Sequence, residues 1–375
     1  MTARRNAARR AMLRGAGLLL PRPGAAGEPR RILLIRPDHL GDLLFLTPGL
    51  HALRAALPSA HITLLAGPWS VPVVNGNSDL DALSSLPFPG FERRPRSGLA
   101  APYQLLRREA QALRAEQYDV AVVLRFDHWW GAWLAAAAGI PRRVGYDLPD
   151  TRPFLTQPLR YEAGRHEVLQ NTRLLDALAP LAAEPGPMRY AIEPAAEAWA
   201  CDWLAMQGLG AKPLAAIHPG AGAVVKQWAP ERWGATARGL LDRGCDVIVT
   251  GGPHEASLAR AVTLAAGDGP VIAAGQTTLA QLAALYGRCA VVLGADCGPL
   301  HLAVAVGTPT VHLYGPASPA MFGPWGNPGR HRALVTDWGC APCNRLDWPA
   351  DLLPQHDCMA AFTPERVLIE AEALL

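Results

Sequence analysis

The segment that most constrains the fold of this chain lies near its C-terminal end. An apolar run over 290–293 predicts a buried strand, a glycine-containing turn follows at 296–298, and a short helix is expected from Pro299 to Gly307. A second apolar run over 309–313 predicts another strand. Strand, turn, helix and strand in this order form a parallel βαβ unit, which indicates an open α/β sheet.

The turn of this unit is a candidate ligand-binding site. Open α/β sheets bind ligands at the carboxyl ends of their strands, and the amide groups at a helix start attract anions. Asp296, Cys297 and Gly298 form the turn, and His301 follows it within the helix. We expect Asp296 and His301 to fix the molecule that carries a bound anion. The alternative is an ordinary turn in which Asp296 only caps the helix.

Length and composition indicate a globular protein with two domains. The chain has 375 residues, of which 50% are hydrophobic and 18% are charged. Residues 1–31 contain eight arginines and one glutamate, a net charge of +7, whereas the whole chain has +3 and its remainder therefore −4. A mildly acidic body argues against broad nucleic-acid binding. Only two of the basic residues are lysines, Lys212 and Lys226.

The basic N-terminal segment, residues 1–30, is expected to be flexible. Its arginines alternate with apolar residues, so it could lie on an anionic membrane surface; a disordered leader is the alternative. The apolar run over 15–20 is short and lacks a signal-peptide cleavage site. No apolar run approaches the roughly 20 residues that span a bilayer. We expect a cytoplasmic protein, either free or bound peripherally at the inner face of the membrane.

Strand and helix patterns alternate through the rest of the chain in two sets, separated by a stretch rich in proline over 184–194. The sequence predicts an α/β protein with two Rossmann-like, doubly wound parallel sheets, over 31–190 and 191–375, with the active site in a cleft between them. The expected strands are 31–35, 61–66, 119–124, 143–146, 214–217, 246–250 and 271–274, besides the two above. The expected helices are 43–57, 103–117, 128–138, 167–181, 231–243, 254–266, 279–286 and 364–374, besides the one above.

Two carboxylates follow the first predicted strand. Asp38 and Asp42 lie in the loop that leads into the next helix. Asp42 comes at a position where a carboxylate can face the expected cleft and accept a proton. The alternative is a helix cap, which stabilises a helix by about 1 kcal/mol. The dinucleotide fingerprint G-x-G-x-x-G is absent after this strand.

Two loops of the second half carry further polar groups after predicted strands. His218, Gly220 and Gly222 belong to a glycine-rich turn that lets backbone amides approach phosphate, and Lys226 follows as a point charge. The turn lacks the G-K-[ST] ending of a Walker loop. Glu255 follows the next strand, where it binds a ribose hydroxyl pair or is simply an exposed glutamate at a helix start. With the turn at 296–298, these groups describe a nucleotide-diphosphate site.

The cysteines fall into two groups. A C-x-x-C motif and a later H-x-C motif could place four ligands around zinc; the alternatives are free thiols, a local disulfide or no bond at all. The residues concerned are Cys340, Cys343, His356 and Cys358. Three others are expected to be small buried hydrophobic residues, namely Cys201, Cys245 and Cys289.

As an ordered set, these motifs resemble glycosyltransferase family 9, the heptosyltransferase family of the GT-B fold. The matching segments are 36–42 with 47–48, 218–222 with 226–228, 251–255, and 296–301 with 314–316. The resemblance implies an inverting enzyme. Because the sequence shows no acidic metal cluster, we expect the protein itself to supply the cation that stabilises the leaving group, and we expect no cofactor. The enzyme would transfer a sugar, expected to be heptose from ADP-heptose, to a lipopolysaccharide-core or other cell-surface glycan acceptor.

The resemblance also implies roles for single residues. Asp42 would be the general base that takes the proton of the acceptor hydroxyl, and Glu255 would bind the ribose. Lys226 and the turn from Asp296 to His301 would hold the diphosphate as it leaves. Family members commonly have Thr or Ser where this chain has Cys297, and a thiol is a poor hydrogen-bond partner for phosphate. Two alternatives share these motifs: a nucleotide-sugar epimerase and a non-catalytic nucleotide-sugar-binding protein.

Overall fold

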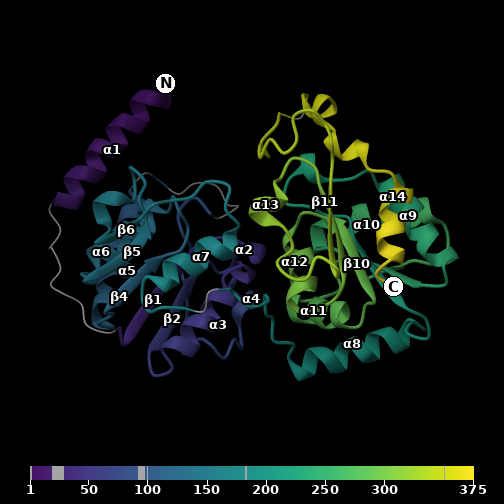
Figure 1. Cartoon of the computed structure of the whole chain (residues 1–375), viewed down its shortest axis with the longest axis horizontal. Coiled ribbons are helices and arrows are strands. Elements are labelled where there is room, and N and C mark those ends of the chain that lie inside the picture. Colours follow the sequence, from purple (N-terminus) through teal and green to yellow (C-terminus); the bar gives the residue numbers. More distant parts are fainter. Residues whose placement is uncertain (1, 19–28, 92–97, 99, 182–183, 350) are drawn as a thin grey trace. The chain divides into compact units, whose positions relative to one another are not determined.

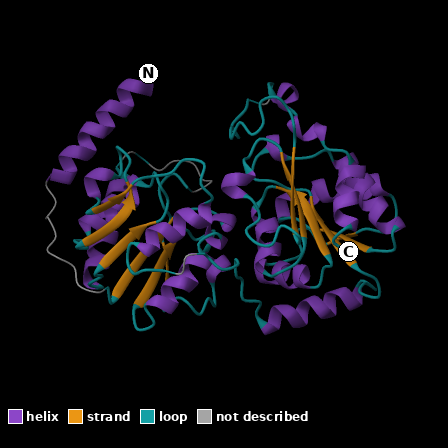
Figure 2. Ribbon diagram, viewed as in Figure 1, coloured by secondary structure: helices purple, strands orange, loops and turns teal. Residues whose placement is uncertain are grey.

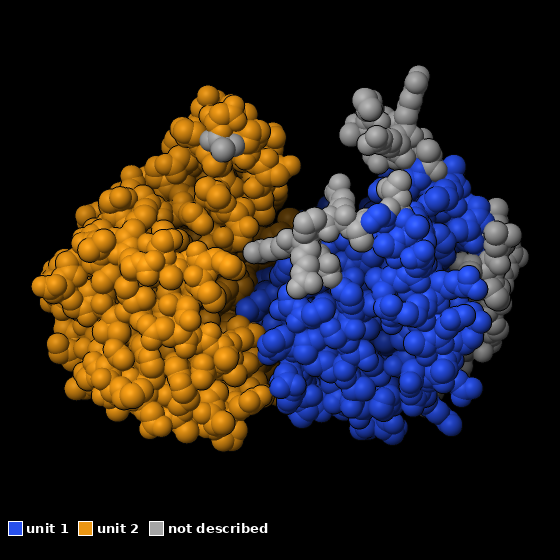
Figure 3. Space-filling view, turned by 180° about the vertical axis from the view of Figure 1, so that it is seen from behind, with its two compact units in different colours: residues 1–186 blue, residues 187–375 orange. Residues whose placement is uncertain are grey.

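The computed structural model describes residues 2–18, 29–91, 98, 100–181, 184–349 and 351–375 (Figure 1). The chain divides into two compact units, Met1–Gly186 and Pro187–Leu375 (Figure 3). Each unit contains one six-stranded parallel sheet with flanking helices (Figure 2). The predicted pair of doubly wound parallel sheets is therefore confirmed. The units separate within the proline-rich stretch over 184–194.

The sheet of the N-terminal unit has the strand order β3-β2-β1-β4-β5-β6. Its central strand β1 is buried because the apolar run 32–35 packs between helices on both sides. The strands are β1 (Arg31–Arg36), β2 (His61–Ala66), β3 (Ala82–Ser85), β4 (Val120–Val123), β5 (Arg142–Tyr146) and β6 (Gln157–Leu159). The helices beside them are α2 (Leu40–Leu44), α3 (Thr47–Ala56), α4 (Val71–Val74), α5 (Ala101–Ala115), α6 (Trp129–Ala137) and α7 (Glu167–Asp176).

The sheet of the C-terminal unit has the order β12-β11-β10-β7-β8-β9, which repeats the arrangement of the first sheet. The strands are β7 (Leu214–His218), β8 (Asp246–Val249), β9 (Val271–Ile272), β10 (Val291–Ala295), β11 (Thr310–Tyr314) and β12 (His331–Val335). The helices are α8 (Pro194–Met206), α9 (Pro230–Asp242), α10 (Ala256–Ala266), α11 (Leu279–Gly287), α12 (Gly298–Ala305), α13 (Pro319–Phe322) and α14 (Pro364–Glu372). The βαβ unit predicted at 290–313 is present as β10, α12 and β11.

Three predictions of local structure are wrong. The helix expected over 43–57 is two helices, α2 and α3, because Pro48 occupies the first turn of α3 and cannot continue the preceding one. Pro194, interpreted as part of a linker, instead begins α8, a common place for proline. Cys201 on α8 is exposed, whereas Cys245 and Cys289 are buried as expected.

Part of the basic N-terminal segment, for which we expected flexibility, forms the helix α1 (Thr2–Leu18). Leu13 is fully buried in a cluster with Phe154, and the guanidinium groups of Arg9 and Arg10 pair with Asp150. Residues 19–28 lie outside the described part of the chain. None of the described helices is long and apolar enough to cross a membrane.

Candidate functional site

Both sheets reverse their direction of winding at one point, between β1 and β4 in the first unit and between β7 and β10 in the second. The loops beyond the carboxyl ends of such strands are where open α/β sheets bind ligands. In the first unit this edge carries Asp38 and Asp42 after β1. In the second unit it carries Gly220 after β7 and Asp296 after β10. The predicted site residues therefore lie at the ends of the strands that flank each reversal or after them, except Glu255, which follows the neighbouring strand β8.

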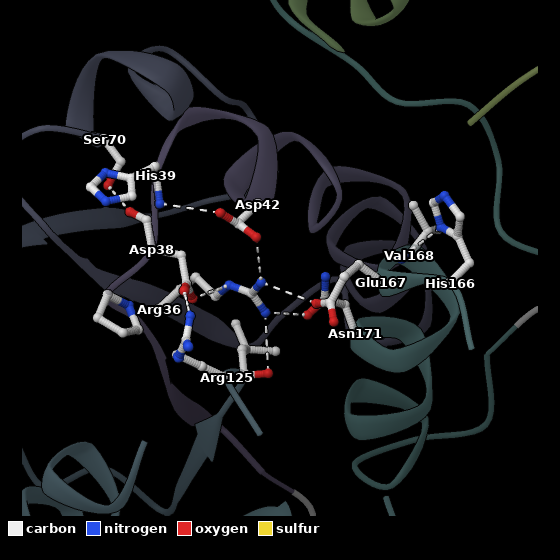
Figure 4. Close-up of polar contacts among 12 residues, drawn as sticks. Arg36, Asp38, His39, Asp42, Ser70, Arg125, His166, Glu167, Val168 and Asn171 are labelled. Atoms are coloured by element: carbon white, nitrogen blue, oxygen red, sulfur yellow. Dashed lines mark hydrogen bonds and ion pairs between the residues drawn. The ribbon is translucent and has the colours of Figure 1, made fainter. Parts of the chain in front are cut away.

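The carboxylates of the first unit converge on Arg36, which sequence reasoning missed (Figure 4). Arg36 is the last residue of β1, and only 2% of its side chain is exposed. Its Nε lies 2.7 Å from Asp38, and its Nη2 lies 3.1 Å from Glu167 and 3.4 Å from Asp42. The three anions around it raise the pKa of Arg36, although burial alone would lower it. An arginine directly before a loop with two carboxylates was the available signal.

Two neutral groups complete the surroundings of Arg36. Its Nη1 donates hydrogen bonds to the Asn171 side chain at 2.9 Å and to the Leu124 carbonyl at 3.1 Å. Glu167 begins α7, where a carboxylate is favoured by the helix dipole, and Asn171 lies one turn further along. The sequences of β1 and α7 thus place a buried cation and its acceptors at one point.

The Asp42 side chain is partly exposed, and its pKa is shifted from the usual value. Its carboxylate accepts a hydrogen bond from the His39 amide at 3.3 Å, so the helix-cap contact named as the alternative is present. However, the same carboxylate also contacts Arg36, and 30% of its side chain is exposed. Burial in its surroundings and the charge of Asp38 raise the pKa of Asp42 to about 6, against the opposing effect of Arg36. A carboxylate that is ionised near neutral pH yet fairly basic suits proton abstraction.

Asp38 has a different environment from Asp42. Burial would raise the pKa of Asp38, but the charges of Arg36 and Arg125 lower it below its usual value. Its side chain is 3% exposed and forms an ion pair with Arg125 on the side away from Arg36. A buried carboxylate that is paired twice is a counter-ion, so the geometry favours Asp42 over Asp38 as a reacting group.

In the second unit, Lys226 and the turn after β10 meet as the motifs suggested. Lys226 ends the short 3₁₀ helix Val224–Lys226, and its Nζ lies 2.8 Å from Asp296. His301 on α12 contacts the other oxygen of Asp296 at 3.5 Å. Burial would raise the pKa of Asp296, but His301 and Lys226 lower it to about 2. Asp296 is therefore ionised and holds both side chains at the start of α12.

Cys297 is the N-cap residue of α12, in an extended conformation. Its thiol is buried, and this burial raises its pKa to about 12. Because the pKa lies far above neutrality, Cys297 is a protonated thiol at physiological pH. It adds no negative charge at the start of α12, beside the Gly298 amide.

The glycine-rich turn after β7 lies against Glu255. The Glu255 carboxylate accepts a hydrogen bond from the Gly252 amide at 2.7 Å and lies 3.8 Å from Nε2 of His218. A Cβ atom at residue 220 would lie 1.9 Å from Oε1 of Glu255, so any side chain there would displace the Glu255 carboxylate, whereas a Cβ at Gly222 would meet no atom within 4 Å. Burial lowers the pKa of His218. The turn, His218 and Glu255 thus share one edge with Lys226 and Asp296.

The cysteine motifs after β12 are arranged differently from a closed metal site. Within the described residues, no group of three or more His, Cys, Asp or Glu side chains is placed to hold a metal ion. The His356 ring stacks on Trp348 with 3.4 Å between the ring centroids. Cys340 and Cys343 are exposed thiols, while Cys358 is buried. Burial and the two nearby thiols raise the pKa of Cys358 to about 11.

Comparison with known proteins relates the sequence to one family. The sequence model of glycosyltransferase family 9 (heptosyltransferase) matches residues 106–349. Lipopolysaccharide heptosyltransferase 2 of Escherichia coli K12 is 25% identical, over 92% of this chain and 98% of that protein. Lipopolysaccharide heptosyltransferase 1 of Pseudomonas aeruginosa PAO1 is 28% identical, over 92% of this chain and 98% of that protein.

Solved structures share the fold. The structure of E. coli ADP-heptose lps heptosyltransferase II superposes with a TM-score of 0.74 at 23% identity, over 92% of this chain and 98% of that chain. The E. coli heptosyltransferase WaaC with ADP has a TM-score of 0.69 at 18% identity, over 92% and 100%. Because the family model matches more than half of the residues, the chain belongs to glycosyltransferase family 9, the heptosyltransferases, and is a glycosyltransferase.

Proposed function

We propose that this enzyme transfers heptose from ADP-heptose to the lipopolysaccharide core or a related cell-surface glycan, with inversion at the anomeric carbon. The observation that carries the proposal is the Asp42 carboxylate, partly exposed at the carboxyl end of β1 with a pKa raised to about 6. Asp42 takes the proton of the acceptor hydroxyl as that oxygen attacks the anomeric carbon. The bond from this carbon to the diphosphate breaks, and ADP leaves.

Donor binding is assigned to the second unit. Lys226 and the amide of Gly298 hold the diphosphate. Asp296 orients Lys226 and His301 and does not contact the phosphate, because two anions would repel each other. Glu255, in contact with the turn at Gly220, accepts hydrogen bonds from the ribose. An ADP-sugar is supported by the E. coli relative solved with ADP-2-deoxy-2-fluoro heptose. That the two edges form one active site stays a prediction.

The test is a transfer reaction with purified protein, ADP-heptose and lipopolysaccharide whose core lacks heptose. We expect release of ADP and an acceptor heavier by one heptosyl residue. Conversion of ADP-heptose without acceptor into an isomeric nucleotide sugar would instead identify an epimerase. Tight binding of ADP-heptose without turnover, across several truncated acceptors, would identify a binding protein.

We also propose that α1 binds the anionic inner face of the cytoplasmic membrane, near the glycolipid acceptor. The helix carries five arginines, and Arg14, Arg10 and Met12 on it are exposed. Each basic residue near an anionic surface contributes about 1 kcal/mol. The protein should sediment with vesicles that contain phosphatidylglycerol and less with neutral phosphatidylcholine vesicles. The variant Arg10→Gln/Arg14→Gln should bind the anionic vesicles more weakly; equal binding would exclude α1 as the contact.

A further inference from the structure

The arrangement around Asp42 suggests how its reactivity is controlled, on the basis of the function proposed above. Arg36 is buried at the end of β1, and each of its three side-chain nitrogen atoms contacts at least one oxygen of a neighbouring residue (Figure 4). Its Nη2 is shared between Asp42 and Glu167, at 3.4 and 3.1 Å. Its Nη1 is held by Asn171 at 2.9 Å, so the guanidinium cannot rotate away from Asp42 without losing this contact.

The charges that face Asp42 come from four elements. They belong to Arg36 of β1, Asp38 of the loop with His39, Arg125 beyond β4, and Glu167 of α7. His128, also beyond β4, is uncharged near neutral pH because burial lowers its pKa to about 3. Of these groups, Arg36 is the cation in direct contact with Asp42, since Arg125 pairs with Asp38 and Asp127. Arg36 and Glu167 therefore act on Asp42 with opposite signs.

We propose that Arg36 and Glu167 are positioning residues for the transfer reaction: Arg36 holds the Asp42 carboxylate in place, and the Arg36–Glu167 pair sets the charge that Asp42 experiences. Neither residue needs to contact the sugar. After burial and Asp38, the charges of Arg36 and Glu167 are the next largest influences on the pKa of Asp42, the first lowering it and the second raising it. The pair therefore keeps Asp42 basic while still ionised at neutral pH.

Two substitutions that break the same ion pair should have opposite effects. Since Asp42 must be ionised to act, kcat/KM should fall as the pH drops below about 6 in the wild type. This fall is the acidic limb of the pH–rate profile. Glu167→Gln removes a negative charge, so this acidic limb should move to lower pH, by up to about one unit. Arg36→Gln removes the positive charge, so the limb should move to higher pH by about one unit or more. A merely structural role predicts lower activity in both variants without opposite shifts.

Further variants separate positioning from charge and from unfolding. Arg36→Lys keeps the positive charge but cannot bridge Asp42, Glu167 and Asn171. We therefore expect kcat to fall, the acidic limb to move little, and the KM for ADP-heptose to stay unchanged. Glu109→Gln is the matched control, because Glu109 on α5 pairs only with its neighbour Arg108 in the described contacts. It should leave kcat and the limb unchanged. If Arg36→Gln does not fold, Arg36→Lys and Glu167→Gln still decide the question.

The experiment combines pH–rate profiles with carboxyl ¹³C NMR titration of the full-length protein, using Asp42→Asn to assign the Asp42 signal. Opposite shifts of the limb and of the NMR titration in Glu167→Gln and Arg36→Gln would support the proposal. An unmoved Asp42 titration in folded Glu167→Gln protein would overturn it. If Asp42→Asn itself retains turnover, the assignment of the base fails, whereas the NMR titration still reports whether Arg36 and Glu167 control Asp42.

Discussion

At the residue scale, the two carboxylates of the loop after β1 differ in how many arginines they contact. Asp38 and Asp42 are four positions apart in one loop, and nothing in their sequence spacing ranks one above the other. Their roles separate because Asp38 pairs with two arginines whereas Asp42 shares Arg36 with Glu167, 125 residues further along the chain. Contacts across such a separation require the tertiary structure, which is why the sequence indicated Asp42 but not Glu167.

Lys226→Ala is predicted to weaken binding of ADP-heptose. A charge-assisted contact to phosphate contributes about 1.5–3 kcal/mol, which is roughly a 10- to 150-fold change in Kd. The loss also leaves the Asp296 carboxylate without its cation beside the proposed diphosphate. Calorimetry measures the effect, with Lys212→Ala as control because Lys212 is the other lysine of the chain and is exposed. Equal affinities of the Lys226→Ala and Lys212→Ala proteins would place the phosphate elsewhere.

Cys297→Ser tests how the start of α12 meets the donor. The buried thiol is protonated and a weak hydrogen-bond partner, whereas a hydroxyl can bond to phosphate. We expect the affinity for ADP-heptose to be maintained or to rise by up to about 1 kcal/mol. Competition between ADP-heptose and UDP- or GDP-sugars, measured with both proteins, checks donor identity at the same time. A clear loss of ADP-heptose affinity with an unchanged circular dichroism spectrum would argue against a phosphate at this turn.

At the element scale, long buried strands were predictable and short or exposed elements were not. β2 has the expected bounds because its apolar run is bounded by turn residues on both sides. The strands β3, β6 and β12 were missed because edge strands bury one side only, and β6 contains Pro158. A proline can end a helix or begin one, and neighbouring contacts decide between the two. This choice determines both the break between α2 and α3 and the start of α8.

The turn between β7 and Lys226 provides a test at this scale. Gly220→Ala places a methyl group where Oε1 of Glu255 now lies, so this flexible side chain must move from the ribose position proposed for it. We expect ADP-heptose to bind about 10-fold or more weakly, the effect of losing one to two hydrogen bonds, with little change in thermal stability. Gly222→Ala is the matched control, since its added methyl group meets open space. Similar affinities in the two variants would exclude Glu255 from donor binding.

At the scale of the whole molecule, two units with the same strand order carry different chemistry. The carboxyl edge of the first sheet has an excess of acidic groups around one buried arginine. That of the second has a lysine, the two histidines His218 and His301, and a glycine-rich turn. The sequence motifs already predicted this difference between the two units, and the order of the motifs along the chain indicated the family. The strand order and the ion-pair partners came from the structure, because side chains that pair across 70 or 131 positions carry no local pattern.

The proposed mechanism depends on Asp42 as the general base, and the turnover of Asp42→Asn decides whether it has this role. The amide keeps the size of the carboxylate, and its single oxygen can still accept the hydrogen bond from Arg36 or the one from the His39 amide, so the fold and ADP-heptose binding should be retained. We predict that kcat falls by roughly 10²- to 10⁴-fold, the usual effect of losing a general base, while the Kd for ADP-heptose stays within about twofold. Turnover equal to that of the wild type, in folded protein with normal donor binding, would contradict the account.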